Sequence, residues 1–347
     1  MRIGFFNSSL PQPGRKPGGV DKHLHRLANA LEEAGHEVTF YTYSEAPQGA
    51  RYSTVRLTPH RFANSMLART TLVPLRLNMV DTGDLDVLHL HGDDWFFLRR
   101  RVPTVRTFYG SALYEARQAT RLRRRVSQYV TYALELLSSR LATSTYSLIP
   151  EEGAAYRTRG YLPCGVGDGH AIGRVEEETP NILFVGTWNG RKRGRLLHEA
   201  FVREVRRRRP GAELVMVSDH CEPADGVRWR PSPSDEELRE LYLRASVFCL
   251  PSSYEGFGIP YIEAMATDTP VVATDNPGAR FVLDDGAAGL IVRDDELGDS
   301  LTGLLGDPVR RSELARAGRE RVQEFAWPRI VQAHEAAYRE AIARFRR

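Results

Sequence analysis

The sequence is poor in cysteine and has no long apolar run. The first feature argues against a cysteine-bound metal, and the second against a membrane-spanning helix. Its three cysteines, Cys164, Cys221 and Cys249, are odd in number and show no Cys-x-x-Cys spacing. This pattern argues against a zinc site and is typical of a chain from a reducing cytoplasm. No run reaches the roughly 18 apolar residues that suggest a membrane-spanning helix. The apolar run from Ile3 to Phe6 has the length of a strand and is too short for the core of a signal peptide.

Several catalytic and metal-binding signatures are also missing. The sequence contains no G-x-G-x-x-G, no Ser-His-Asp or Cys-His arrangement and no internal repeat, so no protein nucleophile is indicated. His89 and His91 share one face of an expected strand, but no third ligand with metal-binding spacing follows them. Asp84-Leu85-Asp86 has the form of a metal-binding Asp-x-Asp motif, yet it precedes an apolar strand and is interpreted as a turn. We therefore expect no metal site.

The net charge is small but unevenly distributed. Lys and Arg total 48 against 44 Asp and Glu, which gives +4. Arginine-rich runs occur at residues 99–101, 121–125 and 206–209. Such runs are usually solvated faces, and they can also meet anionic substrates or a membrane surface. Nucleic-acid binding is the weaker interpretation, because aromatic residues are not interleaved with the arginines and no recognisable module is present.

A chain of 347 residues predicts two domains of similar size. At its start, a strand at Ile3 to Phe6, an amphipathic helix from Val20 to Leu31 and a strand at Val38 to Tyr43 predict a βαβ unit. Gly18 and Gly19 stand at the entrance of that helix, where backbone amides can approach a phosphate. A simple turn is the alternative for these two glycines.

His91 is a candidate for the site because of its place on the next expected strand, Asp86 to His91. It lies nearest the carboxyl end of this strand, and ligands of α/β sheets bind at that edge. A histidine of the core is the alternative.

Residues 111–142 have helical periodicity, with an apolar stripe downstream of the second arginine-rich run. We expect the stripe to pack on the sheet and the arginines to face water. A helix that lies on a membrane interface is the alternative.

The most informative stretch runs from Val247 to Thr274. It predicts an apolar strand, a loop with Gly256 and Gly258, a short helix opened by Pro260, a turn and a second apolar strand. Glycines before a helix let its free amides approach an anion, and the helix dipole favours negative charge. We therefore expect a phosphate to bind here.

Two carboxylates flank the same loop, and cations gather on another. Glu255 and Glu263 can accept hydrogen bonds from vicinal hydroxyls, so they are expected to hold a sugar and a ribose; a surface loop residue and a helix-dipole partner are the alternatives. Arg191, Lys192 and Arg193 precede an expected helix at residues 196–207 and predict an anion site, with an exposed basic loop as the alternative.

The run from Glu255 to Pro260, followed by Glu263-Ala264-Met265-Ala266 and Thr269-Pro270-Val271-Val272, resembles the donor-site motif of family 4 retaining glycosyltransferases. The resemblance is strongest from about Asn181 to Trp327. It implies an α/β protein of the GT-B fold, with two Rossmann-like domains facing each other across a cleft. Residues 1–168 would form the acceptor-side domain and residues 169–328 the nucleotide-sugar domain. A final helix at residues 329–347 would cross back to the first domain.

The resemblance also implies roles for individual residues. In the family, a Gly-Gly loop lies against the donor diphosphate, a histidine lies near the transferred sugar, and cations stand beside the leaving diphosphate. The nucleotide base sits near a segment that corresponds here to Trp229 and Arg230, and a surface role for both residues is the alternative. The expected catalytic residues are His91, Lys192, Arg193 and Glu255, and the expected donor-binding residues are Gly18, Gly19, Thr187, Arg230, Gly256, Phe257, Gly258, Ile259 and Glu263.

The chain departs from the family pattern at several of these places. Thr187 stands where an Arg usually follows the glycine of a strand, and the positive charge is moved to Lys192 and Arg193. Asp268 replaces a usual Gly, and Phe281 replaces a usual Glu.

The resemblance implies a metal-independent hexosyltransferase that moves a sugar from a UDP- or GDP-sugar to an acceptor hydroxyl, with retention of anomeric configuration. The nucleotide sugar is a co-substrate, and no cofactor is expected. The acceptor is a glycan, a lipid or a small metabolite; no nucleic acid is expected, and the protein is expected in the cytoplasm, with peripheral contact to the inner membrane face as an option. Sugar-nucleotide epimerisation or phosphorolysis on the same fold is the alternative. The sequence leaves the oligomeric state open.

Overall fold

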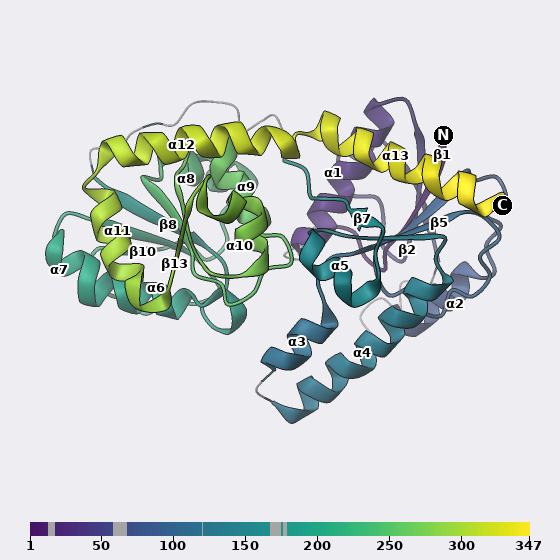
Figure 1. The fold of residues 1–347 in the computed structure, drawn as a ribbon, viewed down its shortest axis with the longest axis horizontal. Helices are drawn as coiled ribbons and strands as arrows, with labels where there is room; N and C mark the ends of the chain where they lie inside the picture. Colours follow the sequence, from purple (N-terminus) through teal and green to yellow (C-terminus); the bar gives the residue numbers. More distant parts are fainter. Residues whose placement is uncertain (13–17, 58–67, 120, 167–174, 176–178) are drawn as a thin grey trace. The chain divides into compact units, whose positions relative to one another are not determined.

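The computed structural model describes residues 1–12, 18–57, 68–119, 121–166, 175 and 179–347. The chain forms two compact units, one of Met1–Gly165 with Trp327–Arg347 and the other of Val166–Ala326 (Figure 1). The domain boundary expected between residues 168 and 169 lies outside the described residues. Each unit is built on a parallel sheet with helices on both faces, so the predicted α/β class and the pair of Rossmann-like domains are confirmed.

Unit 1 carries a seven-stranded sheet in the order β3-β2-β1-β4-β5-β6-β7. Side chains alternate across it, so that Phe5 and Ile3 enter one core cluster while Phe6 and Leu88 enter another on the opposite face. The strands are β1 Arg2–Phe6, β2 Glu37–Thr42, β3 Ser53–Arg56, β4 Val87–Leu90, β5 Thr104–Phe108, β6 Ser144–Ser147 and β7 Gly160–Tyr161.

Helices α1 (Gly19–Glu33) and α13 (Trp327–Phe345) pack against each other on the face that holds Phe5. In α1, buried apolar residues recur at spacings of three and four, as the sequence predicts, and the helix ends before Gly35, whose φ of +84° suits glycine. The remaining helices of the unit are η2 Ala68–Leu72, α2 Val73–Leu77, α3 Ala112–Gln118, α4 Leu122–Leu141 and α5 Pro150–Tyr156.

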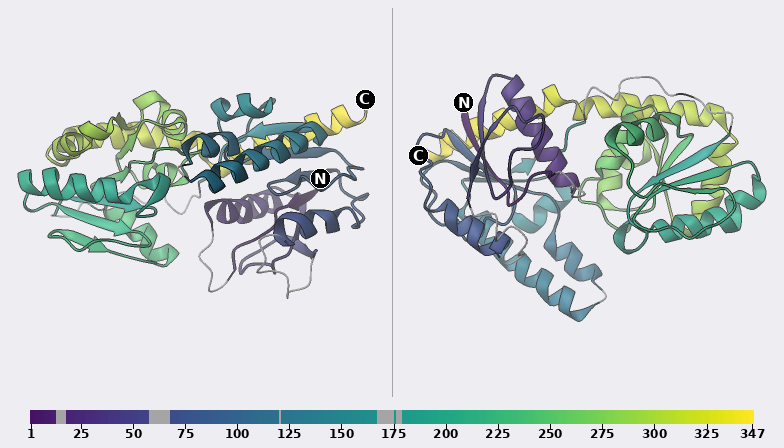
Figure 2. Two further views of the ribbon diagram at one scale, coloured as in Figure 1. Left: turned by 90° about the horizontal axis from the view of Figure 1, so that it is seen from below. Right: turned by 180° about the vertical axis from the view of Figure 1, so that it is seen from behind.

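Two expectations for residues 111–142 are wrong. The segment forms two helices, because the chain turns extended at Ala119, whose carbonyl accepts hydrogen bonds from the Arg125 guanidinium. The apolar stripe of α4 does not pack on the sheet: Val126 and Val130 are exposed, and neither core cluster of unit 1 includes a residue of this helix. Figure 2 shows α3 and α4 beside each other at the margin of the unit.

Unit 2 carries a six-stranded sheet in the order β10-β9-β8-β11-β12-β13. Helices α6, η5 and α11 pack together near β11, whereas α8, α9 and α12 form a second packed group against β11 and β12. The strands are β8 Asn181–Val185, β9 Glu213–Val217, β10 Val227–Trp229, β11 Val247–Leu250, β12 Val271–Thr274 and β13 Leu290–Val292, and the helices are η4 Gly190–Lys192, α6 Gly194–Ala200, η5 Phe201–Val205, α7 Arg206–Arg208, α8 Asp235–Arg244, α9 Ile259–Ala266, α10 Pro277–Val282, η6 Asp284–Gly286, η7 Asp294–Glu296, α11 Leu297–Leu305, α12 Pro308–Val322 and η8 Gln323–Phe325.

Among the described residues, all three cysteines are buried free thiols. No helix in the described ranges combines the length and the hydropathy that a membrane crossing requires.

Candidate functional site

The loops after β8 and β11 meet at the switch point of the sheet in unit 2. These strands are neighbours in the sheet, while the chain runs from β8 outward to β9 and β10 before it returns to β11. Ligands of open parallel sheets bind beyond the carboxyl ends of strands at such a point. Residues 186–193 follow β8 and residues 251–258 follow β11, so the two stretches that the sequence singled out lie at one edge.

The loop after β11 ends in a left-handed turn that starts α9. Gly258 is the N-cap residue with a φ of +93°, and Pro260 is the second residue of the helix. A Cβ on Gly258 would lie 2.3 Å from the Tyr261 ring, so only glycine fits without displacement. Gly256 and Phe257 are buried, Ile259 is half-buried, and the Phe257 ring packs edge-on against Phe325 at 5.4 Å. The side chain of Phe257 therefore belongs to the core, and the residue can contact a ligand only through its backbone.

Glu255 lies buried at this edge between two cations from the loop after β8. Lys192 Nζ lies 2.7 Å from one carboxylate oxygen, and Arg191 donates to the other at 2.9 Å. Burial acts to raise the pKa of the Glu255 carboxyl, but the two cations more than offset it and lower that pKa. Burial also lowers the pKa of the Lys192 ammonium, and Glu255 opposes this shift only in part. The three groups carry a net charge of +1, which leaves the edge attractive to an anion.

Glu263 lies one helical turn into α9 and is half-buried. Tyr242 donates to its Oε2 at 3.3 Å. Its negative charge also acts to raise the pKa of Lys192, which places the carboxylate within electrostatic range of that ammonium. The structure thus gathers Lys192, Glu255 and Glu263, three of the predicted residues, around one loop.

Arg193 points elsewhere, although it is adjacent to Lys192. Its backbone is left-handed, with a φ of +52°, and its guanidinium donates to Thr274, to the Pro251 carbonyl and, through two nitrogens, to Asp294. Arg193 therefore ties the loop to β11, β12 and η7. Sequence reasoning placed Arg191 in the basic loop but did not select it as a catalytic residue, whereas the structure places Arg191 beside Glu255. A run of three cations does not show in which direction each side chain points.

Two other predicted donor-binding residues lie on the surface of unit 2. Thr187 is exposed, and its hydroxyl donates to the Asn189 carbonyl at 2.8 Å. Arg230 is exposed after β10. Hydrogen bonds with Ser234 first, and then the positive charge of Arg230, lower the pKa of Glu237. Ser234 and Glu237 form the capping box of α8.

The predicted residues of unit 1 gather at the carboxyl edge of its own sheet. Gly18 is the N-cap residue of α1 and Gly19 its first residue. Asp21, in the first turn, accepts hydrogen bonds at 3.2 Å from the side chains of Asn7 and Ser9, which follow β1. The edge between β1 and β4 is the switch point of this sheet.

His91 follows β4 directly and is buried. Its Nδ1 lies 2.9 Å from the Tyr109 hydroxyl, and its ring lies 4.5 Å from Phe5 and 3.9 Å from His89. Burial first, and then the neighbouring histidines and Arg106, hold the pKa of His91 well below its usual value, so the ring is neutral at pH 7. Its buried Nε2 has no hydrogen-bond partner among the described residues, which is unusual for a histidine that serves only the core.

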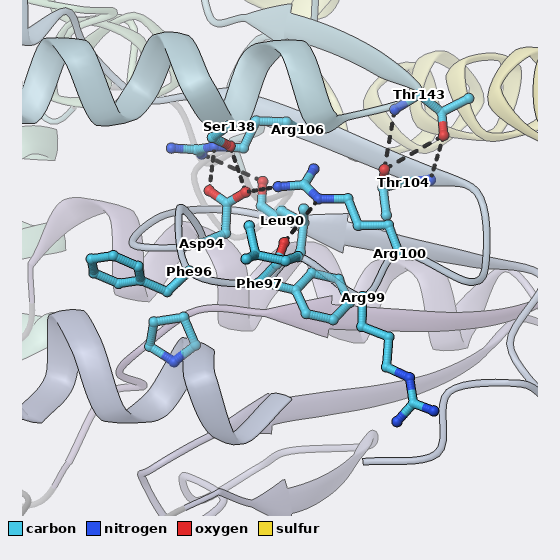
Figure 3. Close-up of polar contacts among 12 residues, drawn as sticks. Leu90, Asp94, Phe96, Phe97, Arg99, Arg100, Thr104, Arg106, Ser138 and Thr143 are labelled. Carbon is cyan, nitrogen blue, oxygen red and sulfur yellow. Dashed lines mark hydrogen bonds and ion pairs between the residues drawn. The ribbon is translucent and has the colours of Figure 1, made fainter. Parts of the chain in front are cut away.

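A buried charged group in unit 1 holds the loop that follows His91. Asp94 lies within 2.8 Å of Arg106 and 3.0 Å of Arg100, and it accepts from the Ser138 hydroxyl at 2.5 Å (Figure 3). Removing one partner of a buried pair of this kind typically costs about 3–5 kcal/mol, because it leaves a buried charge uncompensated. Sequence reasoning assigned Arg100 only to a solvated run and gave Arg106 no role.

Two departures from the family pattern have structural explanations. Asp268 takes the left-handed backbone that a glycine would favour, with a φ of +58°, and Arg319 holds its carboxylate with two nitrogens. Phe281 packs at 6.1 Å from Phe257 in an aromatic cluster, with the Arg321 guanidinium 5.6 Å from its ring centre. Neither position offers a carboxylate to the loop at Gly256.

The predicted Asp84-Leu85-Asp86 turn lies before β4, and Asp86 accepts from the Arg2 amide at 2.7 Å. Within the described ranges, no group of three or more His, Cys, Asp or Glu side chains is placed to hold a metal ion.

Comparison with known proteins gives matches for both units. The family model described as Glycosyltransferase Family 4 matches residues 17–147, and the model described as Glycosyl transferases group 1 matches residues 179–307. The phosphatidyl-myo-inositol mannosyltransferase of Mycolicibacterium smegmatis is 28% identical over 94% of this chain and 90% of its own length. The D-inositol 3-phosphate glycosyltransferase of Paenarthrobacter aurescens is 26% identical over 98% of each chain.

Solved structures of the same architecture extend over nearly the whole chain. The sucrose-phosphate synthase of Thermosynechococcus elongatus has a TM-score of 0.79 at 21% identity and covers 99% of both chains. Anabaena HepE in complex with UDP and glucose has a TM-score of 0.73 at 14% identity, with 98% of this chain and 100% of that one covered. At these identities the likeness shows the fold. With a family model matched in each unit, this chain belongs to the family 4, group 1 glycosyltransferases and has the GT-B fold.

Proposed function

We propose that this glycosyltransferase takes its sugar from a nucleoside diphosphate sugar and transfers it to an acceptor hydroxyl with retention of configuration. The observation that carries the proposal is the buried Glu255 between Lys192 and Arg191, beside the glycine turn that starts α9. Two cations for one carboxylate leave positive charge where a diphosphate can bind. The turn adds helix amides and the helix dipole.

Each residue of this group has a proposed role. Lys192 and Arg191 neutralise the charge that grows on the leaving diphosphate, a contribution that is large in a site with little water. Glu255 accepts hydrogen bonds from the sugar and keeps the two cations in place before the donor binds. Glu263 accepts from the ribose hydroxyls. Arg193 acts as a positioning residue, because its guanidinium is already bound to Asp294 and Thr274.

The proposed reaction breaks the bond between the anomeric carbon and the diphosphate oxygen. The acceptor hydroxyl attacks from the same face, and its proton passes to the departing phosphate oxygen, so that no protein nucleophile is needed. For unit 1, the backbone amides at Gly18 and Gly19, at the start of α1, are proposed as donor-binding groups. Neutral His91 offers its Nε2 to a substrate hydroxyl.

The identities of donor and acceptor are proposed by class. A UDP- or GDP-sugar is the proposed donor, and the complex of HepE with UDP and glucose supports testing UDP-glucose first. The names of two relatives, a phosphatidyl-myo-inositol mannosyltransferase and a D-inositol 3-phosphate glycosyltransferase, refer to inositol-containing molecules. Inositol, inositol phosphate and phosphatidylinositol are therefore the first acceptors to test. Fixed cations supply the charge at the diphosphate, so we propose that transfer needs neither a divalent metal nor a cofactor.

Thermal shift with nucleoside diphosphates and their sugars tests donor binding. A ligand at about a hundred times its Kd should stabilise the protein by about 2.7 kcal/mol. Lys192→Gln should weaken the affinity for the stabilising nucleotide at least about tenfold, since one charge-assisted contact is worth about 1.5–3 kcal/mol. Arg203→Gln, an exposed cation of the same unit, is the matched control and should bind normally. Equal affinity of the two variants would refute the assignment of the diphosphate site.

Product analysis then tests the reaction. The anomeric proton of the glycoside, read by NMR, should show the configuration of the donor, and the rate should be unchanged by a chelator. Nucleoside diphosphate should be released only when an acceptor is present. Epimerised sugar nucleotide without an acceptor would instead establish an epimerase.

A further inference from the structure

Helix α4 turns an apolar face to solvent. Leu122, Val126, Tyr129, Val130 and Leu137 are exposed to 73%, 55%, 46%, 56% and 41% of their surface. With the exposed Ala133, they recur at spacings of three and four, which places them on one stripe of the helix. An exposed apolar stripe of this length is costly in water and marks a surface that is covered by something else.

The opposite face of α4 is held by polar contacts. Ser138, the buried residue of this helix, donates to Asp94 (Figure 3). Ser139 donates to the Tyr156 carbonyl at 2.8 Å. Tyr132 donates to the Ala155 carbonyl at 3.3 Å, and Tyr156 donates to Glu135. On its inward side the helix makes these hydrogen bonds and half-buries Leu134 and Leu136, while its apolar stripe points outward. These inward contacts fix the rotation of α4 about its own axis, so the apolar stripe is held on the outward side.

Positive charge borders this stripe. Residues 116–134 include five arginines and no Asp or Glu. Arg121 and Arg123 are exposed at the start of α4, and Arg124 lies 3.6 Å from Glu115 in an exposed pair, which is worth little. The acid of the helix, Glu135, is bound to Tyr156 on the inward face. The outward face thus presents apolar and cationic groups together.

We infer that the outward face of α4 docks on an anionic lipid surface, with the apolar stripe in the interface and the arginines at the phosphates. Apolar residues with flanking arginines and an aromatic residue are the features that place a helix in the plane of a membrane. A second copy of this chain is the less suitable occupant. A two-fold pair of α4 helices would offer the arginines no carboxylate, since the outward face of the second half carries Ala133, Leu137 and Arg140. The inference does not depend on the donor or on the acceptor.

Co-sedimentation with vesicles tests the inference. The full-length protein should bind vesicles that contain about a third of phosphatidylglycerol in phosphatidylcholine and should bind phosphatidylcholine alone at least about tenfold more weakly, as each arginine adds about fivefold on an anionic surface. Raising the salt from about 0.1 M to about 1 M shortens the Debye length from about 10 Å to about 3 Å, and it should weaken binding. Equal binding to both vesicles, or none to either, would overturn the inference.

Two double variants separate the apolar and the cationic contributions. Val126→Ser with Val130→Ser should lower the partition coefficient about tenfold, and Arg121→Gln with Arg123→Gln should lower it by a similar factor. The matched controls lie in unit 2: Val309→Ser, exposed to 68%, and Arg203→Gln with Arg207→Gln, both exposed. The controls should bind as the wild type does. If the double valine variant binds vesicles as the wild type does, the stripe does not contact lipid and the inference is wrong. If the variant instead abolishes a concentration-dependent dimer, the stripe is covered by a second copy of the chain and not by lipid.

A site-directed label gives a readout that misfolding cannot imitate. The natural cysteines are buried, so Val130→Cys can be labelled selectively with an environment-sensitive fluorophore. Its emission should shift to the blue on anionic vesicles, whereas a label at Val309→Cys should not shift. An unchanged spectrum at position 130 on vesicles that bind the protein would place the contact elsewhere. Nucleotide-induced thermal shifts should be the same for all these variants, so a failure of the donor proposal and a failure of this one remain distinguishable.

Discussion

A buried group of histidines predicts that unit 1 loses stability on mild acidification. His23, His89, His91 and His334 are each at most 3% exposed. Burial, with charge from His334 and Arg26, lowers the pKa of His23 to about 3, and burial lowers that of His334 to about 4. The pKa values of His89 and His91 also fall well below the usual value. The folded state therefore keeps all four rings neutral under conditions in which the unfolded chain binds protons.

The sign and the size of the effect follow from linkage. The pKa of each histidine is lowered on folding, so its contribution to stability is complete above about pH 6.5 and is lost as the pH falls toward the folded pKa. At pH 5 the loss is about 1.5 pH units times 1.36 kcal/mol, or about 2 kcal/mol for each histidine. For His23 and His334 together it is about 4 kcal/mol, against about 5–15 kcal/mol for a typical domain.

The assay has to report on unit 1 alone, because a two-domain chain need not unfold in one step. Hydrogen exchange of β4 and β5, read by mass spectrometry at pH 8 and pH 5, gives the free energy of opening at each pH. His334→Gln should reduce the difference between the two pH values by about 2 kcal/mol. His220→Gln, which removes an exposed histidine of unit 2, should leave the difference unchanged. If His334→Gln retains the full loss of the wild type, the histidine does not stay neutral in the fold and the reasoning fails.

Three further predictions concern the loop and turns of unit 2. Glu263→Ala should raise the donor KM at least about tenfold, since a charged acceptor contact is worth about 1.5–3 kcal/mol; normal donor binding in steady-state kinetics would count against the ribose role. Gly258→Ala should destabilise the unit by about 2 kcal/mol or more in thermal melts, because the backbone is left-handed and the Cβ would meet the Tyr261 ring; an unchanged melting temperature would show that the turn relaxes. Asp268→Ala and Asp268→Gly both lose the pair with Arg319, but only Ala keeps the left-handed strain, so Ala should be the less stable by about 1 kcal/mol; equal stabilities would contradict the strain.

The fold could be read from the sequence because each half repeats short apolar strands with amphipathic helices between them. The strands at Val247–Leu250 and Val271–Thr274 occur where the pattern predicted them. Periodicity does not say which side of a helix is covered, and this is why α4 was assigned wrongly. Its register is fixed by Ser138 and Asp94, residues 44 apart whose contact has no local signal.

The candidate site was predicted in part for a similar reason. Glu255, Gly258 and Glu263 lie in one stretch whose spacing carries the information, and the structure places them around one turn. The histidine group is different, since His23, His91 and His334 come from three distant segments and meet only in the folded unit. No pattern in the sequence joins them.

The loop after β8 shows how the backbone selects among adjacent cations. Gly190–Lys192 is a tight helical turn, and Arg193 then adopts a left-handed backbone that costs about 1–2 kcal/mol in a residue other than glycine. This change of direction sends Arg193 to Asp294 and leaves Lys192 facing Glu255. The contacts of Arg193 offset the strain, so its guanidinium serves to hold the backbone that aims Lys192. Glycine at position 193 adopts the left-handed backbone without strain but lacks the guanidinium charge. Arg193→Gly should therefore retain more donor affinity than Lys192→Gln in nucleotide titrations. If Arg193→Gly instead lost more donor affinity than Lys192→Gln, Arg193 would be the residue that binds the diphosphate.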